Sequence, residues 1–161
     1  MLQKYILSTL FIFSISTPAF AEMPVVENSN HEIMLSSTDK NLAANKRLVY
    51  DFWREVLEGG HLEFATKYLD ESYIQHNPNV PTGRAGFVEY FSKFRKPKDI
   101  ATRIKAPIVS IIAEGDLVAL SFVREEDEPK DKTKKYTTTW FDTFRIKDGK
   151  IVEHWDSDIK E

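Results

Sequence analysis

The spacing of apolar residues changes between the two halves of the chain, and this change limits the fold more than any other feature. In the first half the apolar residues recur every three to four positions, which is typical of helices, whereas in the second half they alternate, which is typical of strands. Helices that precede a run of strands pack on one face of the sheet. The order therefore predicts an α+β domain, in which three N-terminal helices cover the concave face of a curved antiparallel sheet.

The helical half has clear boundaries. The first predicted helix carries one apolar stripe and ends at Gly59-Gly60, as expected for a C-terminal glycine. Residues 62–69 predict a short second helix and residues 87–94 a third. The stripe of the first helix consists of Leu48, Val49, Phe52, Trp53, Val56 and Leu57.

The strands follow a loop that is rich in turn-forming residues. A short strand is expected over residues 72–76, and the loop over residues 77–83 contains Asn, Pro and Gly. Residues 125–134 are highly charged, and we interpret them as the solvated tip of a hairpin. The remaining predicted strands cover residues 104–112, 117–124, 136–146 and 151–159.

Length and composition restrict the class of protein. With 161 residues the chain is long enough for one domain, and 42% hydrophobic residues are typical of a globular protein. The formal net charge of −3 argues against a nucleic-acid-binding protein with a broad basic face. The chain contains no cysteine, which excludes disulfides, thiol catalysis and thiolate metal sites.

Residues 1–21 have the features of a secretory signal peptide. Lys4 precedes an apolar run over residues 5–15, and Ala19-Phe20-Ala21 has the small-x-small form that signal peptidase requires. The run is too short for a permanent span of a bilayer about 30 Å thick, which disfavours a membrane anchor. We therefore expect cleavage after Ala21, a periplasmic or secreted protein without membrane association, a flexible linker over residues 22–40 and a domain over residues 41–161.

Asp142 lies among bulky residues on the strand over residues 136–146, where a carboxylate needs a partner. Its neighbour on the next strand depends on the turn. A two-residue turn at Asp148-Gly149 places Trp155 opposite Asp142. A three-residue turn that includes Lys147 places His154 opposite Asp142, and Asp156 opposite Trp140. A slip of one residue exchanges the two faces, and both turns suit Asp148-Gly149.

The second register brings chemistry-bearing residues onto one concave surface. Trp140, Asp142, His154 and Asp156 would then share a pocket in which two carboxylates and a histidine can divide acid and base roles. His76 could join them from the rim, although a histidine next to Asn-Pro also fits a structural role in a turn. Two histidines with one carboxylate could bind a metal, but their spacing does not support a metal site.

Three segments resemble SnoaL-like polyketide cyclases of the nuclear transport factor 2-like superfamily. Residues 45–60, from Asn-Lys-Arg-Leu to Gly-Gly, resemble the opening helix of these proteins. The segment Tyr-Ile-Gln-His-Asn-Pro at residues 73–78, with residues 81–86, is similar to a motif of a bacterial branch described as candidate catalysts of aldol condensation. The ending at residues 144–156 is similar to the same branch. The resemblance covers residues 41–158.

The resemblance implies a cone-shaped α+β barrel with a deep pocket, commonly assembled as a homodimer. The cyclases close a ring by an intramolecular aldol reaction without a cofactor. The resemblance gives the acid/base role to Asp156, places Trp140 and Asp142 in the pocket, and favours the three-residue turn.

From the residues on the concave surface and from the family resemblance, we expect a cofactor-free acid/base enzyme. It would act on a small hydrophobic carbonyl compound by aldol condensation, cyclisation, isomerisation or a related proton abstraction. Asp156 would be the base, and His154, Asp142 or His76 would position the substrate or stabilise an enolate. The alternative is a non-catalytic periplasmic binding module for a hydrophobic small molecule. No metal or nucleic acid is expected as a partner. The residues expected to contact the substrate are Trp140, Tyr73, Asn77, Tyr136 and Trp155.

Overall fold

The computed structural model describes residues 23–160, in which the helices and one strand precede a run of four strands along the chain. Helix α2 continues directly into a turn of π-helix, η1, and a 3₁₀ turn, η2, precedes α3. The expected signal peptide, residues 1–21, lies outside the described residues. In chain order the elements are α1 His31–Leu35, α2 Lys40–Phe52, η1 Trp53–Glu58, η2 Leu62–Phe64, α3 Ala65–Tyr68, β1 Leu69–Gln75, α4 Arg84–Ser92, β2 Ile108–Glu114, β3 Leu117–Glu128, β4 Asp131–Lys147 and β5 Lys150–Asp156.

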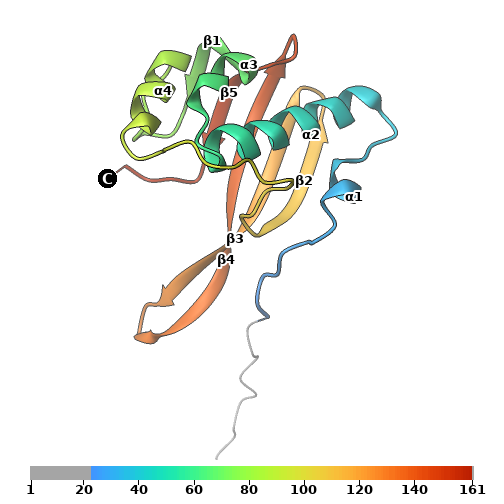
Figure 1. Ribbon diagram of the computed structural model, residues 1–161. Coiled ribbons are helices and arrows are strands. Elements are labelled where there is room, and N and C mark those ends of the chain that lie inside the picture. The colour runs from blue at the N-terminus through green and yellow to red at the C-terminus, as the bar shows by residue number, and fades with distance from the viewer. Residues whose placement is uncertain (1–22, 161) are drawn as a thin grey trace, which may run out of the picture.

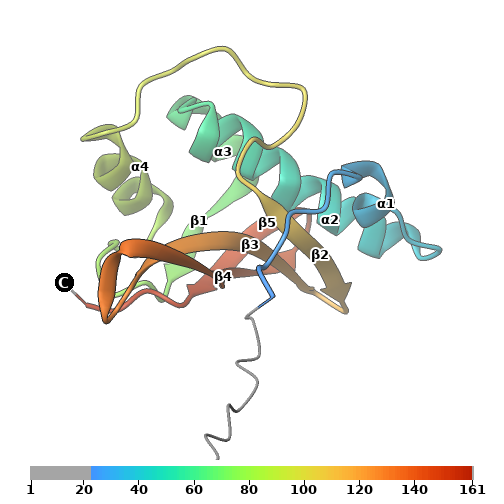
Figure 2. The same ribbon diagram turned by 90° about the horizontal axis from the view of Figure 1, so that it is seen from below.

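The five strands form one curved, unclosed sheet in the order β1-β5-β4-β3-β2. Strands β2 to β5 pair antiparallel, as predicted, whereas β1 pairs parallel with β5. The helices lie together on one side of this sheet, with α2 running across it (Figures 1 and 2). The α+β class, with a curved sheet and helices on one face, is therefore confirmed. No helix within residues 23–160 is long and apolar enough to cross a membrane.

Helix α2 and its extension provide the contact between the two layers. Val49, Phe52 and Val56 are at most 1% exposed and lie on the side that faces the sheet. The ring of Phe52 packs edge-on against Phe144 of β4, with 6.0 Å between the ring centroids. Because the stripe continues into η1, the π-helical turn extends the apolar cover beyond the end of α2.

The turn between β4 and β5 differs from the expected one. Asp148 and Gly149 both have positive φ angles, 52° and 71°, and they form a two-residue turn between Lys147 and Lys150. The pairing then shifts, because Ile146 pairs with Ile151 whereas Arg145 pairs with Glu153. Val152 is thus the extra residue of a β-bulge.

The bulge decides which residues share a face. Beyond it, Phe144 lies opposite His154, and Asp142 lies opposite Asp156. Neither predicted register is therefore correct. The side chains nevertheless lie on the same sides of the sheet as in the three-residue alternative. The two predicted registers differ by one residue, and the bulge adds one residue to β5. His154 and Asp156 consequently lie on the same side as Asp142.

Two segments are more ordered than expected. Residues 31–35, which we assigned to a flexible linker, form α1, and His31 Nδ1 lies 2.7 Å from the hydroxyl of Tyr50. The linker prediction is corrected there, because a buried polar contact and buried Met34 and Leu35 hold the segment on the domain. Residues 125–134 are also not a loop. They extend β3 and β4 into a two-stranded arm that projects from the domain (Figure 1), paired in register as far as Asp127 and Lys135.

Candidate functional site

A cavity of about 270 Å³ lies between the helices and the sheet. Its walls are largely aromatic, and its polar groups come from β1, β4 and β5 and from the start of the loop after β1. An apolar cavity with a few convergent polar groups is typical of a small-molecule site. The aromatic walls are formed by Phe52, Trp53, Phe87, Phe91, Trp140 and Phe144. The polar lining consists of Tyr73, Gln75, Asn77, Asp142, His154, Asp156 and Arg95.

Three side chains form a hydrogen-bonded row across the polar wall. His154 Nε2 lies 3.0 Å from Asp142 Oδ1, and His154 Nδ1 lies 2.7 Å from Gln75 Oε1. The side chains of Asp142 and His154 are 7% and 9% exposed. Asp142 is thus paired with His154 inside the cavity, as its apolar surroundings require.

The backbone determines where the protons of this row lie. The backbone N–H of Asn77 donates to Gln75 Oε1 over 3.0 Å, so this oxygen is an acceptor. An acceptor facing His154 Nδ1 requires a hydrogen on Nδ1. A contact between Nε2 and Oδ1 then needs one further proton, either on the ring or on the carboxyl group. A hydrogen bond between these two atoms thus means one shared proton and no net charge on the pair.

Asp156 is held by different donors. Its Oδ2 accepts from the side-chain amide of Asn77 over 2.7 Å, and its Oδ1 accepts from the backbone N–H of Asp158 over 2.9 Å. Its Oδ2 also lies 4.0 Å from His154 Nδ1. These contacts fix the orientation of the Asp156 carboxyl group, which remains next to the Asp142–His154 pair.

Tyr73 adds a neutral donor to the same wall. Its hydroxyl oxygen accepts from the Gln75 side-chain amide over 3.0 Å, which leaves the hydroxyl hydrogen free to donate. Burial raises the pKa of the Tyr73 hydroxyl, and the carboxyl groups of Asp142 and Asp156 raise it further. Tyr73 therefore stays protonated and can stabilise negative charge on an oxygen of a bound molecule.

Two buried polar atoms of the lining residues have no hydrogen-bond partner within residues 23–160. They are Asp142 Oδ2, an acceptor, and Trp53 Nε1, a donor. A buried polar atom without a partner costs about 1–3 kcal/mol, so such atoms are uncommon in structural cores. Their presence beside the cavity indicates a site that is completed by a bound molecule.

The metal hypothesis can be tested against these contacts. Asp142, His154 and Asp156 each offer a ligand atom, and these atoms lie within 4.8 Å of one another. Both ring nitrogens of His154, however, are already engaged, and Gln75 Oε1 requires the hydrogen on Nδ1. A metal would have to displace one of these contacts, so the donor set fits a metal poorly.

Three residues that we predicted at the site lie elsewhere. His76 and Trp155 point to the opposite face of the sheet, where their rings stack with centroids 5.1 Å apart and His76 Nε2 lies 2.8 Å from Glu153 Oε1. Tyr136 lies at the base of the β3–β4 arm, beside a separate hollow that Pro24 and Glu125 also line. The two-histidine form of the metal hypothesis is therefore excluded by the direction of His76.

The structure also adds residues that the sequence analysis did not select. Side chains alternate along β1, so Tyr73, Gln75 and Asn77 face the cavity while Ile74 and His76 face away. The period of two in this segment could have identified Gln75 in place of His76. No pattern in the sequence marks Arg95, since it follows the end of α4 in an irregular segment.

The comparisons with known proteins agree on the fold. The family model of the SnoaL-like domain matches residues 49–154. A candidate polyketide cyclase from Acidithiobacillus ferrooxidans is 22% identical, with a TM-score of 0.50 over 75% of this chain and 89% of that one. An epoxide hydrolase from M. tuberculosis, described as LEH-like, is 14% identical, with a TM-score of 0.50 over 72% of this chain and 83% of that one. No curated protein matches the chain.

Proposed function

The chain belongs to the SnoaL-like domain family, and we propose that it is an acid/base enzyme that needs no cofactor. It would remove a proton from the carbon next to a carbonyl group in a small hydrophobic molecule. The enolate formed in this way is the common intermediate of aldol condensation, cyclisation and isomerisation. With a signal peptide at residues 1–21, the enzyme would meet its substrate in the periplasm or outside the cell.

The observation that carries this proposal is the contrast between two carboxyl groups in one cavity. In this proposal Asp142 shares a proton with His154, whereas Asp156 receives its hydrogen bonds, among the described residues, from the amide of Asn77 and the N–H of Asp158. Two carboxyl groups in different surroundings are a typical source of separate acid and base roles. Asp156 is accordingly the base, and the Asp142–His154 pair is the protonated partner.

The first step transfers one proton and one electron pair. An oxygen of Asp156 takes the proton from the α-carbon, the electrons of the broken C–H bond form a carbon–carbon double bond, and the carbonyl oxygen becomes an enolate oxygen. The Tyr73 hydroxyl donates a hydrogen bond to this oxygen. Before this step Asp156 carries the one net negative charge, because the Asp142–His154 pair is neutral. After the step Asp156 is a neutral carboxylic acid and the charge lies on the enolate oxygen, so no second net negative charge in the cavity repels it.

The second step depends on the substrate. Protonation of the enolate at a different carbon by the Asp156 carboxylic acid gives an isomer and regenerates the carboxylate. Attack of the enolate carbon on a second carbonyl group forms a carbon–carbon bond, and the resulting alkoxide takes the proton from Asp156. Both routes return the site to its first state, as catalysis requires.

Deuterium incorporation tests the first step without knowledge of the natural substrate. We expect the purified protein to accelerate the exchange of the α-hydrogens of 2-octanone in D₂O, measured by mass spectrometry. Asp156→Asn should lower this rate by about 10²–10⁴-fold, the usual contribution of a positioned base. His76→Gln, on the opposite face of the sheet, serves as the matched control and should retain the rate.

Other outcomes have a clear meaning. Equal exchange rates for the wild type and Asp156→Asn would remove Asp156 from the mechanism. Binding of 2-octanone without any exchange, detected by the fluorescence of Trp53 and Trp140, would assign the cavity to a binding module.

A further inference from the structure

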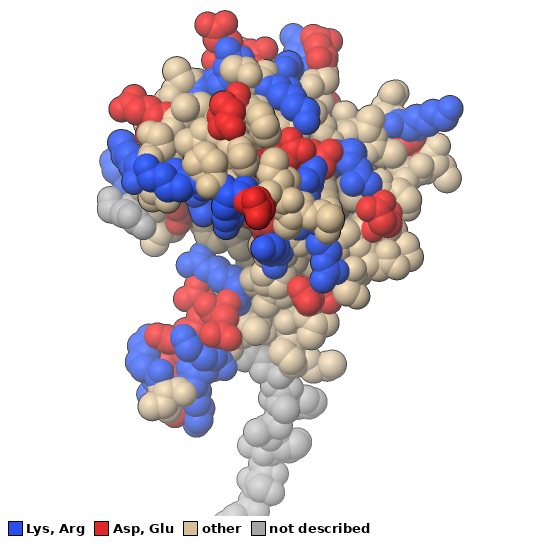
Figure 3. All heavy atoms as spheres, viewed as in Figure 1, with Lys and Arg blue, Asp and Glu red and all other residues tan. Residues whose placement is uncertain are grey.

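A basic segment passes beside the cavity and contributes Arg95 to its lining. Residues 93–107 connect α4 to β2 without regular secondary structure. The chain as a whole has a net charge of −3, but this segment contains six basic residues and one acid, Asp99. Lys and Arg side chains gather over the segment that follows α4 in Figure 3. The basic residues are Lys93, Arg95, Lys96, Lys98, Arg103 and Lys105.

The basic segment is held in place by the first helices. The backbone N–H of Lys98 donates to the carbonyl of Gly59 over 2.9 Å, and the carbonyl of Lys98 lies 2.9 Å from His61 Nε2. Gly60 has a φ of 73°, and a Cβ there would lie 2.3 Å from the carbonyl oxygen of Lys96. The segment thus has a fixed path beside the cavity, which a glycine at position 60 permits.

Arg95 is the member of this segment that reaches the cavity. Its backbone N–H donates to the carbonyl of Phe91 over 2.8 Å, so Arg95 lies one turn beyond a residue of the aromatic wall. Arg95 lines the main cavity and also a neighbouring hollow of about 180 Å³. Trp53 and Leu57 line both spaces as well, so the two spaces share one wall at this point.

The cations on this wall differ in their partners. Arg54 is neutralised by Asp51 and Glu55, with N–O distances of 3.0 and 2.7 Å. Within residues 23–160, by contrast, no oxygen binds the guanidinium of the exposed Arg95, which lies 5.9 Å from the ring centroid of Phe94.

The neighbouring hollow repeats this contrast. The ammonium groups of Lys98 and Lys105, which also line it, have no carboxylate partner in the described part of the chain. The carboxylate of Glu58, on the same wall, is occupied by the backbone N–H groups of Lys105 and Ala106, at 2.9 and 2.8 Å. Asp99 also lines this hollow, but no carboxylate of the described residues lies at ion-pair distance from Arg95.

We propose that Arg95 binds an anionic end of the molecule that occupies the cavity, so that the ligand is an apolar compound with a carboxylate. The inference rests on the proposed function, because it names the class of substrate for the same cavity. The apolar part would lie against the aromatic wall, and the carboxylate would accept from the planar guanidinium at the mouth. Lys98 and Lys105 add to the positive potential there. A single free guanidinium matches a singly charged head group.

A pair of simple ligands tests this proposal. Octanoate and octanamide have the same chain and nearly the same head-group shape, and they differ in charge. We expect the wild-type protein to bind octanoate at least tenfold more tightly, measured by calorimetry. In Arg95→Gln the two affinities should become equal within about threefold. Raising NaCl from 0.02 to 0.5 M should weaken the binding of octanoate and leave that of octanamide unchanged.

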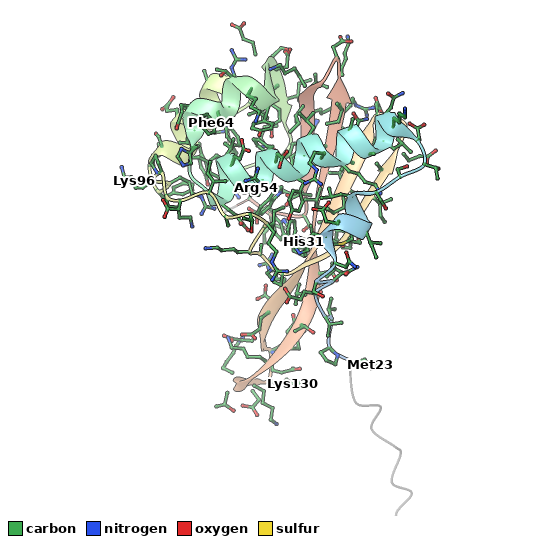
Figure 4. All side chains as sticks on the ribbon, turned by 45° about the vertical axis from the view of Figure 1, so that its right-hand side comes forward. Met23, His31, Arg54, Phe64, Lys96 and Lys130 are labelled. Carbon is green, nitrogen blue, oxygen red and sulfur yellow. The ribbon has the colours of Figure 1, made fainter. Side chains whose placement is uncertain are left out.

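Lys130→Gln is the matched control, because it removes one positive charge at the end of the β3–β4 arm, far from Lys96 (Figure 4). This variant should keep the preference for octanoate. The proposal is overturned if octanoate fails to bind, if octanamide binds equally well, or if Lys130→Gln reduces the preference as much as Arg95→Gln.

Neither probe reports on proton removal, because the measurement is binding. A protein that prefers octanoate but does not exchange 2-octanone would refute the proposed reaction and retain the proposed ligand class. A protein that exchanges the α-hydrogens of 2-octanone and shows no preference for octanoate would retain the proposed reaction and refute the proposed ligand class.

Discussion

The two faces of the sheet at β1 and β5 carry similar residues with different consequences. On the inner face His154 contacts Asp142 and Gln75, and all three side chains line the cavity. On the outer face His76 contacts Glu153, and its side chain is 43% exposed. Both histidines have a carboxylate neighbour at hydrogen-bond distance.

The difference between the two pairs comes from what surrounds them. Arg145 also binds the carboxylate of Glu153, because Arg145 Nε donates to its Oε2 over 2.9 Å. The inner pair has no such access to water, and its protons are determined by a backbone N–H. A histidine beside a carboxylate thus indicates chemistry only when the pair is buried, ordered and adjacent to a cavity.

The largest expected effect follows from removing the partner of the buried carboxylate on the inner face. His154→Leu leaves Asp142, whose side chain is 7% exposed, without the ring that it contacts, and it leaves Gln75 Oε1 without the ring on its other side. We expect a midpoint of unfolding more than about 10 °C lower, because removal of one partner leaves a buried carboxyl group unpaired. Circular dichroism during thermal unfolding measures this.

The control for this variant is His76→Leu, the same change on the outer face, where the histidine side chain is 43% exposed. It should unfold within a few degrees of the wild type. Equal unfolding midpoints for His154→Leu and His76→Leu would show that burial does not distinguish the two histidine–carboxylate pairs.

The second prediction compares two tyrosines. Tyr73→Phe removes the hydroxyl that we assign to the enolate, and it should lower the exchange rate of 2-octanone about 10²-fold, as is typical for loss of an oxyanion donor. Tyr136→Phe makes the same change at the base of the arm and should leave the rate within twofold. Equal rates in all three proteins would exclude Tyr73 as the donor.

The third prediction concerns Gln75, a positioning residue. Gln75→Leu leaves His154 Nδ1 and the Asn77 N–H without an acceptor, so we expect a loss of about 1–3 kcal/mol in the free energy of unfolding. It also removes the reason for a hydrogen on Nδ1. The ¹⁵N chemical shifts of the His154 ring should therefore move toward the other tautomer or become averaged.

Two results check that interpretation. Gln75→Glu retains an acceptor for both groups and should preserve the hydrogen on Nδ1. A variant Gln75→Leu with unchanged ¹⁵N shifts would show that the tautomer is set without Gln75.

The smallest effect is expected on the outer face. Hydrogen bonds from His76 and then Arg145 lower the pKa of Glu153, so this carboxylate stabilises the folded protein above the ordinary value near 4.3. That contribution is lost as the pH falls through the lower folded-state value. Glu153→Gln should lower the unfolding midpoint by about 1–3 °C at pH 7 and by less at pH 3. If Glu153→Gln lowered the unfolding midpoint more at pH 3 than at pH 7, the charged form of Glu153 would not be the stabilising one.

The alternation in the second half of the sequence was enough to predict the sheet, whereas its chemical face was favoured only by the resemblance to the SnoaL-like family. Trp140, Asp142, His154 and Asp156 line the cavity as the favoured face required, even though the turn itself has two residues. The choice of His76 over Gln75 was wrong because the rule that side chains alternate along a strand was not applied to residues 73–77. Arg95 could not be found, since its position depends on how α4 and the basic segment pack over the sheet.

The sequence by itself determined the α+β class, because the period of apolar residues fixes which elements can bury a face. It also determined that Asp142 needs a partner, since an acid among bulky apolar neighbours cannot remain unpaired. Only the tertiary structure decided which partner it has. The bulge at Val152 depends on the pairing of β4 with β5, and the hydrogen on His154 Nδ1 depends on a backbone N–H that lies 77 residues away in the chain. Contacts between distant segments leave no local pattern, and for this reason the site could be outlined from the sequence but not completed.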